Sequence, residues 1–218
     1  MTKKYESRAI RDQVLIATLS HITFDGWTLK SIEAGAIDSG KDLGWGAEMA
    51  KMAFPNGVNQ LVDHYVNWID REMLSELEKL DLSSMRIRDR ISTIVRLRLQ
   101  IMSSYREEVR RLLSYLALPP NNPQAARLTW AVADTMWYAA GDQSSDYNYY
   151  TKRVLLASVY STTILYWLVD ESDGFSDTWS YLDRCIDNVM KIPVASSKIK
   201  KSFNAIINFC APIQDANS

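Results

Sequence analysis

Few residues of this chain have the types and spacing that chemistry requires, and none of them completes a catalytic or metal-binding motif. Residues 35–42, GAIDSGKD, have the spacing of a phosphate-binding loop, but Asp42 stands where that loop needs Ser or Thr to hold Mg²⁺. Residues 170–174, DESDG, hint at a calcium loop but lack its frame and its closing Glu. We interpret the first segment as a turn between helices, and the second as a solvated loop before a helix capped by Ser176.

The histidines and cysteines are equally unsuited to a metal site. His21 and His64 are the only histidines, and neither belongs to a Glu-x-x-His pair or an HExxH motif. We interpret His64, next to Asp63, as part of a partly exposed surface pair. Cys185 and Cys210 lie far from CxxC spacing, which suggests a reducing compartment and no disulfide framework. With no GxSxG elbow either, we expect no catalytic residue, no metal, no cofactor and no enzymatic activity.

One stretch, GDQSSDYNYYTKR at residues 141–153, is unusual for its aromatic content in polar surroundings. Three tyrosines lie between a polar turn and two basic residues, in the order Tyr147, Tyr149, Tyr150, Lys152 and Arg153. Amphipathic rings among charges are typical of a surface that another protein contacts. Ordinary packing at the start of a helix is the alternative.

The composition is that of an ordinary globular protein. The 218 residues carry a formal charge of −1 and are 47% apolar, so only a local patch could attract nucleic acid or anionic lipid. The longest uncharged run, residues 154–169, is too short to span a bilayer comfortably, and we interpret it as a buried helix. From the charged N-terminus we expect no secretory signal.

Apolar residues recur at helical spacing throughout the chain, and Pro and Gly fall between the segments. The pattern predicts an all-α fold of nine or ten helices. Their expected positions are about 6–24, a short helix capped by Thr28 with Ile32 and Ala36 inward, 45–53, 58–80, 86–118 as one or two helices, 124–140, 147–169, 176–191 and 196–210. The inward face of the first helix is expected to comprise Val14, Ile16, Ala17, Leu19 and Ile22.

The last segment, residues 197–210, predicts a basic amphipathic helix. Its apolar face contains Ile199, Phe203, Ile206, Ile207 and Cys210, and its basic residues are Lys198, Lys200 and Lys201. Such a helix on a short tether has the form of an interfacial membrane anchor. Three lysines would contribute on the order of 3 kcal/mol at an anionic membrane, so binding would be weak and reversible. Packing of the apolar face on the body or on a second subunit is the alternative.

Three short helices with a tight turn, followed by one long helix, resemble the start of a TetR-type regulator. The fragment GWTLKSIEAGAIDSG and the later FPNGVNQLVDHYV are similar to that family's helix-turn-helix and its entry into the fourth helix. The charges argue against DNA binding, because a recognition surface needs cations for the phosphates. Residues 25–56 have a net charge of −2, from Lys30, Lys41 and Lys51 against Asp25, Glu33, Asp38, Asp42 and Glu48.

The second half of the chain resembles the coenzyme Q (ubiquinone) biosynthesis accessory family, COQ9. The segments that carry this resemblance are DTMWYAAGDQSSDYNYYTKRVLLASVYSTT (134–163), FSDTWSYLDR (175–184) and the preceding PPNNP (119–123). The resemblance implies a TetR-like fold without DNA binding, a lipid cavity among the C-terminal helices and a terminal helix that docks on the membrane. It also implies binding to the di-iron demethoxyubiquinone hydroxylase, to which the protein presents a quinone intermediate.

The resemblance carries over to individual residues. The implied hydroxylase-binding patch comprises Asp134, Tyr149, Tyr150 and Arg153. The lipid cavity, for an isoprenoid quinone intermediate or a phospholipid, is placed only coarsely. Candidates to line it are Trp137, Leu155, Val159, Ile164, Trp167 and Leu168, with packing in the core as the alternative at such helical spacing. We expect a helix-turn-helix segment at 1–56, a helical lipid-binding domain at 57–192, and a tether with the amphipathic helix at 193–218.

The leading hypothesis is therefore a lipid-binding accessory protein of ubiquinone hydroxylation, expected to form a homodimer. We expect it in the bacterial cytoplasm at the inner membrane, or alternatively on the matrix face of the mitochondrial inner membrane. A TetR-type transcriptional regulator that senses a hydrophobic ligand is the second hypothesis. A stand-alone enzyme is the third, which the missing motifs disfavour.

Overall fold

The computed structural model describes residues 2–41, 44–144 and 147–191. The regular structure of these residues is entirely helical and includes no strand, which confirms the prediction of an all-α fold. The α-helices are α1 (Thr2–Asp25), α2 (Leu29–Ser39), α3 (Glu48–Ala53), α4 (Gly57–Leu77), α5 (Ile87–Ile101), α6 (Arg106–Leu116), α7 (Asn122–Ala139), α8 (Tyr147–Trp167) and α9 (Ser176–Met190). The predicted segment 86–118 is two helices, separated by a 3-10 turn at Met102–Tyr105.

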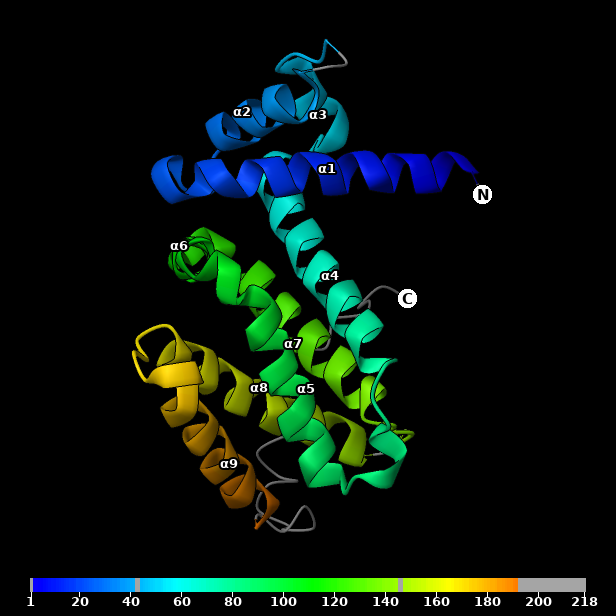
Figure 1. Ribbon diagram of the computed structural model, residues 1–218, viewed down its shortest axis with the longest axis vertical. Helices are drawn as coiled ribbons and strands as arrows, with labels where there is room; N and C mark the ends of the chain where they lie inside the picture. The colour runs from blue at the N-terminus through cyan, green and yellow to red at the C-terminus, as the bar shows by residue number, and fades with distance from the viewer. Residues whose placement is uncertain (1, 42–43, 145–146, 192–218) are drawn as a thin grey trace, which may run out of the picture.

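The first three helices form a compact helix-turn-helix unit at one end of the molecule (Figure 1). As predicted, Thr28 caps α2: its backbone is extended and its hydroxyl accepts a hydrogen bond from the Ser31 amide at 3.3 Å. Ile32 and Ala36 face inward, also as predicted. Ile16 does not, because it is 49% exposed, whereas its neighbours Leu15 and Leu19 are buried.

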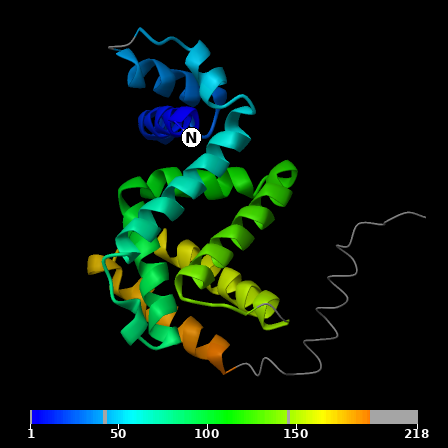
Figure 2. The same ribbon diagram turned by 90° about the vertical axis from the view of Figure 1, so that its right-hand side faces the viewer.

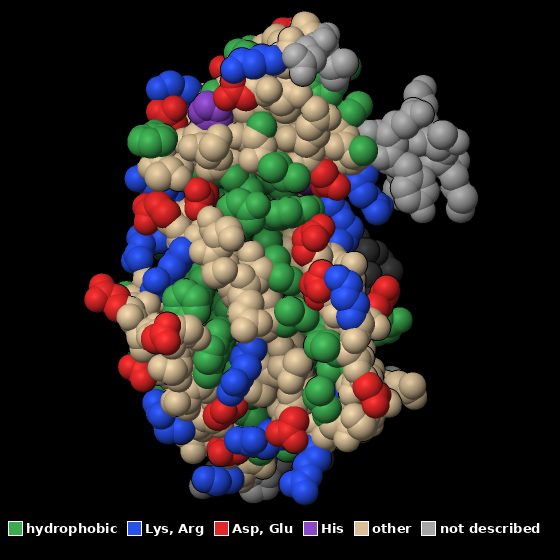
Figure 3. Space-filling model, in the orientation of Figure 1, with side chains coloured by type: hydrophobic (Ala, Val, Ile, Leu, Met, Phe, Trp, Pro, Cys, Tyr) green, Lys and Arg blue, Asp and Glu red, His purple; other side chains and the backbone are tan. Residues whose placement is uncertain are grey.

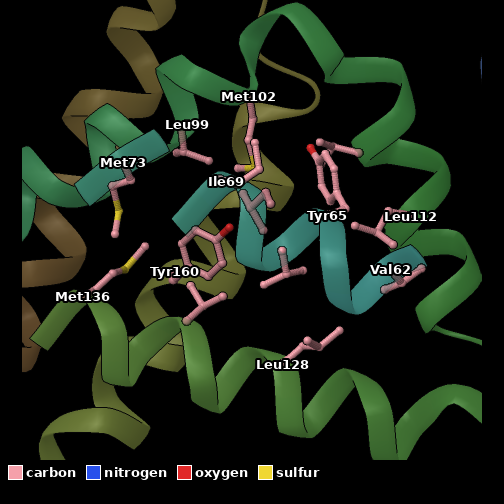
Figure 4. Close-up of a cluster of buried hydrophobic side chains, with 14 of the residues drawn as sticks. Val62, Tyr65, Ile69, Met73, Leu99, Met102, Leu112, Leu128, Met136 and Tyr160 are labelled. Carbon is pink, nitrogen blue, oxygen red and sulfur yellow. The ribbon is translucent and has the colours of Figure 1, made fainter. Parts of the chain in front are cut away.

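The long helix α4 leads from this unit into a bundle formed by α5 to α9 (Figure 1). Its buried face, including Val62, Tyr65, Ile69 and Met73, lies at the centre of the bundle core (Figure 4). The predicted domain boundary at 56/57 falls at the start of α4, which contacts both α1 and α7. The two regions therefore share this helix, and the boundary stays a prediction.

The centre of the bundle also contains a buried ion pair. Arg98 of α5 is 2% exposed, and its guanidinium donates to the carboxylate of Asp70 on α4 and, over 3.2 Å, to the Tyr160 hydroxyl of α8. Burial raises the pKa of Asp70, although the positive charge of Arg98 opposes that shift. Three helices are joined by one guanidinium, which makes this a site where removal of a single partner leaves a charge unpaired.

The DESDG loop before α9 is organised by one carboxylate rather than by Ser176, which is the first residue of the helix and not its cap. Asp170 is buried and accepts hydrogen bonds from the amides of Ser172 and Thr178 at 2.8 and 2.9 Å, and from both hydroxyls. Burial alone would raise the pKa of Asp170, but these hydrogen bonds outweigh it and hold the pKa far below its usual range. The carboxylate takes the capping role predicted for Ser176.

No helix among the described residues is long and apolar enough to cross a membrane. The eight residues predicted to contact a membrane surface, Lys198, Ile199, Lys200, Lys201, Phe203, Ile206, Ile207 and Cys210, lie outside the described part of the chain, as does the predicted segment 193–218.

Candidate partner surface and apolar cavity

The candidate site is built around the corner between α7 and α8, two helices that pack against each other (Figure 2). The chain leaves α7 through Gly141, whose φ of 87° lies in the left-handed region that glycine adopts without strain. The amide of Asp142 donates to the Trp137 carbonyl at 3.0 Å, which closes the end of α7. This turn directs the carboxylate of Asp142 back toward α8.

Three of the four predicted partner-binding residues contact one another at this corner. Arg153 donates from Nε to Asp134 Oδ1 at 2.5 Å, and the Tyr149 hydroxyl donates to the same oxygen at 3.0 Å. The Arg153 guanidinium lies 3.3 Å from the centroid of the Tyr149 ring, a close cation–π contact. The fourth residue, Tyr150, packs edge-to-face against Tyr149 with ring centroids 5.1 Å apart.

The structure assigns different positions to these four residues. Tyr150 is 45% exposed and the side chain of Asp134 is 44% exposed, so both are accessible from solvent. Arg153 is only 3% exposed. Its guanidinium is enclosed because two carboxylates and a ring surround it, and it holds Asp134 and Tyr149 in place from beneath. The partner contact predicted for Arg153 stays a prediction.

Sequence reasoning missed two aromatic residues of this surface. The Trp130 ring lies 6.4 Å from that of Tyr149 and 6.0 Å from that of Tyr150, and Tyr138 is 76% exposed. Both are on α7, four residues on either side of Asp134, which is the spacing that places side chains on one helix face. That spacing was the feature of the sequence from which both residues could have been predicted to share a surface with Asp134. We define the aromatic patch as Trp130, Asp134, Tyr138, Tyr149 and Tyr150.

An apolar cavity of about 460 Å³ lies on the other side of α8. Its walls come from α5, α7, α8 and α9, and its rim contains the polar groups of Arg88, Asp142 and Lys152. Trp137, Leu155 and Val159 line it, so the structure brings together three of the six predicted lipid-binding residues. The apolar side chains that sequence reasoning missed come mainly from other helices, and include Ile87, Ile91, Leu156, Ile186 and Val189.

The other three predicted cavity residues lie elsewhere. Ile164 lines a second cavity of about 400 Å³ between α4, α6, α7 and α8, next to the buried Arg98. Trp167 and Leu168 are buried in the core, where the Trp167 ring, the Phe175 ring and the Arg106 guanidinium contact one another. Helical spacing identified the buried faces of α8, but it did not distinguish the face that lines the first cavity from the face that packs in the core.

One carboxylate connects the first cavity to the aromatic patch. Asp142, with a side chain only 4% exposed, accepts from Lys152 at 2.7 Å on the cavity side and from Arg153 at 3.1 Å on the patch side. Burial would raise the pKa of Asp142, but the hydrogen bonds from Lys152, Ser144 and Arg153 lower it below its usual value. Lys152 also lies 5.4 Å from the Trp137 ring centroid, and Trp137 Nε1 donates to the Lys152 carbonyl at 2.9 Å. The rim and the patch are therefore fixed by one connected polar network.

The part of the chain that matches a family model is the part that contains this site. Residues 122–193, which include α7, the corner, α8 and α9, match the model of the COQ9 family. The chain is 34% identical over 93% of its length to "Ubiquinone biosynthesis protein COQ9, mitochondrial" of Rattus norvegicus and covers 66% of that protein. The protein of the same name from Homo sapiens is 32% identical, with 93% of this chain and 65% of that protein covered. COQ9-B of Xenopus laevis is 31% identical, and the match covers 94% of this chain and 71% of that protein. The chain belongs to the COQ9 family.

The chain spans about two thirds of the length of its rat and human relatives. Among solved structures, the TetR transcriptional regulator from Nitrosomonas europaea ATCC 19718 resembles it with a TM-score of 0.65, covering 84% of this chain and 99% of that chain. At 17% identity this likeness shows the fold alone, and it confirms the predicted TetR-like architecture of this COQ9 family member.

Among residues 2–41, 44–144 and 147–191, no group of three or more His, Cys, Asp or Glu side chains is placed so that it could hold a metal ion. His64 pairs with Asp12 at 2.7 Å and not, as predicted, with its neighbour Asp63, which accepts from Gln124 and Arg127. The described polar groups of the site serve a different purpose, since they pair with one another at the rim of an apolar cavity.

Proposed function

We propose that this member of the COQ9 family is a lipid-binding accessory protein of ubiquinone biosynthesis. In this proposal it docks on the membrane, holds an isoprenoid quinone intermediate or a phospholipid, and presents substrate to the di-iron demethoxyubiquinone hydroxylase. The observation that carries the proposal is the Asp142 network, which joins an apolar cavity to an exposed aromatic patch.

The cavity has the size and chemistry of a lipid site. A volume of about 460 Å³ falls within the range of small-molecule sites, which is roughly 300–1,000 Å³. Its walls are aliphatic apart from Trp137, so an isoprenoid or acyl segment would bury its surface there, while the charged rim would stay next to a polar headgroup or quinone ring. Arg88 at the rim is held by Asp187 at 2.6 Å, which keeps its charge outside the apolar interior.

The aromatic patch has the properties of a protein-binding surface. Tyrosine and tryptophan rings supply large contact area at low conformational cost, and they are enriched among residues that dominate binding energy. Because Arg153 fixes Tyr149 and Asp134 from beneath, the patch is organised before a partner arrives. The hydroxylase is the partner that the family resemblance implies.

Self-association is the second contact that we propose. The outer face of α8 presents an uncharged stripe of exposed residues at helical spacing, namely Ser158, Thr162 and Leu165, and Val169 continues it in the turn after the helix. An uncharged, partly apolar helix face is suited to an isologous contact with the same face of a second copy. We therefore propose a homodimer through α8, with the lipid cavity and the aromatic patch outside the contact.

The cellular setting follows from the same proposal. A carrier of a quinone intermediate must work at the surface of the membrane that contains the quinone, so we propose an inner-membrane surface facing the bacterial cytoplasm or the mitochondrial matrix. The word "mitochondrial" in the names of the relatives supports the second setting. We also propose that residues 197–210 provide the membrane contact.

Binding of the hydroxylase to two variants tests the patch. By calorimetry with the full chain, Tyr150→Lys should weaken binding by about 30-fold or more, as expected for a central aromatic anchor. Arg153→Met should weaken it as well, because Tyr149 and Asp134 lose the group that positions them. Tyr166→Lys at the other end of α8 is the matched control, and equal affinities for the wild type and all three variants would contradict the patch.

Co-sedimentation with anionic liposomes tests the membrane contact. Deletion of residues 197–218 should reduce the bound fraction, because the predicted basic amphipathic helix is removed. Unchanged co-sedimentation would show that this helix packs on the body or on a second subunit instead.

A further inference from the structure

Two cations that serve different surfaces share one buried carboxylate at the corner between α7 and α8. Lys152 lies at the rim of the apolar cavity, where its ammonium group is 5.4 Å from the centroid of the Trp137 ring that lines the cavity. Arg153 lies beneath the aromatic patch and donates to Asp134 at 2.5 Å. Asp142 accepts from Lys152 at 2.7 Å and from Arg153 at 3.1 Å, so a change at one cation alters the interaction of the carboxylate with the other.

The shared carboxylate is held in place by its own backbone and by a neighbouring hydroxyl. The Asp142 amide donates to the Trp137 carbonyl at 3.0 Å, and the two carboxylate oxygens accept from the Ser144 hydroxyl at 2.9 and 2.8 Å. The Asp142 side chain is 4% exposed, whereas that of Lys152 is 34% exposed. The flexible lysine stem can therefore turn toward a ligand while the carboxylate stays where it is.

A ligand in the cavity would meet Lys152 at the rim. Its ammonium group has three hydrogen-bond donors, and a carbonyl or hydroxyl oxygen of the ligand can accept from one of them. Each donor that turns to the ligand weakens the bond from Lys152 to Asp142, and the carboxylate then interacts more strongly with Arg153. The Arg153 contact can shorten from its 3.1 Å, because charge-assisted N–H···O bonds are typically about 2.7–2.9 Å long.

We propose that occupation of the cavity strengthens the binding of the hydroxylase, and that Lys152 couples the two sites. This inference rests on the proposed function, since it concerns the same cavity and the same patch. Arg153 positions Tyr149 through a cation–π contact of 3.3 Å and Asp134 through its Nε atom. Firmer anchoring of this guanidinium by Asp142 therefore orders the patch further before the partner arrives, which favours the loaded protein over the empty one.

Calorimetry of hydroxylase binding to the full chain, empty or loaded, tests the coupling. The loading probe is decylubiquinone, whose ring carries oxygen acceptors, and dodecane is the matched apolar probe without an acceptor. Decylubiquinone should tighten hydroxylase binding by about fivefold or more, the lower end of typical coupling between two sites. Dodecane offers no acceptor to Lys152, so it should leave the affinity unchanged.

Lys152→Met separates this coupling from direct contacts of the probe with the hydroxylase. The variant loses the ammonium group but keeps an unbranched stem beside Trp137, so the hydroxylase should bind it equally well with and without decylubiquinone. Lys79→Met removes a lysine charge from the turn after α4 and should retain the coupling of the wild type. A quinone bound by the hydroxylase itself would act equally on all three proteins.

The reciprocal measurement needs no variant. Because coupling between two sites is mutual, the hydroxylase should tighten the binding of decylubiquinone by the same factor. The inference is overturned, and the proposed function left intact, if both bind the wild type without changing each other's affinity. The same holds if dodecane or Lys152→Met gives the full effect of decylubiquinone on the wild type. If the wild type binds no quinone or no hydroxylase, the proposed function fails and this inference fails with it.

Discussion

The helix-turn-helix unit and the helical bundle place their charged side chains in opposite ways. In α1–α3 the buried polar side chains are the neutral Thr18 and Ser31, and the described charged groups remain accessible to solvent. In the bundle, Arg98, Arg153 and Asp170 are each at least nine-tenths buried; the two arginines are paired with carboxylates, and Asp170 accepts hydrogen bonds from amides and hydroxyls. The face shown in Figure 3 has Lys and Arg interspersed with Asp and Glu over both regions, so neither presents a continuous basic stripe on that side.

This difference indicates where function lies in this member of a TetR-like fold. The helix-turn-helix unit retains the packing of its fold but not the cations of a DNA reader, since α3 carries one lysine and one glutamate. The bundle instead contains cavities with charged groups at their edges. Buried charges cost desolvation energy, so the retention of Arg98 beside a cavity is consistent with specificity in the bundle rather than with stability.

The largest expected effect is removal of one partner of the central ion pair. Arg98→Leu leaves Asp70 buried and unpaired, which should lower the free energy of unfolding by about 3–5 kcal/mol in urea titrations. The double variant Asp70→Leu with Arg98→Met replaces the ion pair by two apolar side chains and should recover most of that loss in stability. A single variant as stable as the wild type would contradict the assignment of buried charge to the bundle.

In the helix-turn-helix unit the substitution that we expect to destabilise most acts through a steric clash rather than through an unpaired charge. A Cβ atom added at Gly35 of α2 would lie 2.6 Å from the Cα atom of Thr18 on α1, so the two helices would have to separate. Gly35→Ala should therefore cost about 2 kcal/mol in thermal unfolding, despite the higher helix propensity of alanine. Ile37→Ala on the exposed face of α2 is the control and should stay within about 0.5 kcal/mol of the wild type.

The buried carboxylate Asp170 predicts a pH dependence that belongs to the bundle. Because its pKa is lower in the folded protein than in the unfolded chain, its contribution is fully present above the unfolded value of about 3.9 and is lost as the pH falls toward the folded value. Asp170→Asn should lose about 1–2 kcal/mol at neutral pH and show a smaller decline below about pH 4. Asp173→Asn, in the same loop but exposed, should behave like the wild type.

The smallest expected effect concerns the binding of duplex DNA. With a net charge of −2 over residues 25–56, the helix-turn-helix should give no salt-sensitive shift of duplex DNA in a gel, and Lys51→Glu should change nothing. A shift that weakens steeply with salt and is lost in Lys51→Glu would support the transcription-factor hypothesis and remove the functional contrast between the two regions.

Sequence reasoning succeeded where local rules decide the structure. Thr28 caps α2 because its hydroxyl reaches an amide three residues on, and helical spacing located every described α-helix. It failed where a distant partner decides. Asp170 replaces Ser176 as the cap only because the loop folds back, and Arg153 is buried only because Asp134 and Asp142 enclose it from another helix and a loop.

The cavity illustrates the same limit. Spacing along the predicted helix 147–169 identified Leu155 and Val159, but equally Trp167 and Leu168, because a helix buried on several faces gives no sign of which face borders a cavity. The missing information was the position of α9, whose Ile186 and Val189 close the cavity opposite α8.

The central claim is that the cavity behind α8 holds a lipid. Mass spectrometry of organic extracts of the purified protein tests it most directly. Wild type, Val159→Phe and the control Val154→Phe would be incubated with vesicles containing phospholipid and ubiquinone, repurified and extracted. Val159 lines the cavity, whereas Val154 is 42% exposed on the same helix. We predict a stoichiometric isoprenoid or phospholipid in the wild type and in Val154→Phe, and a clear loss in Val159→Phe. Lipid-free wild type, or equal lipid in all three proteins, would contradict the claim.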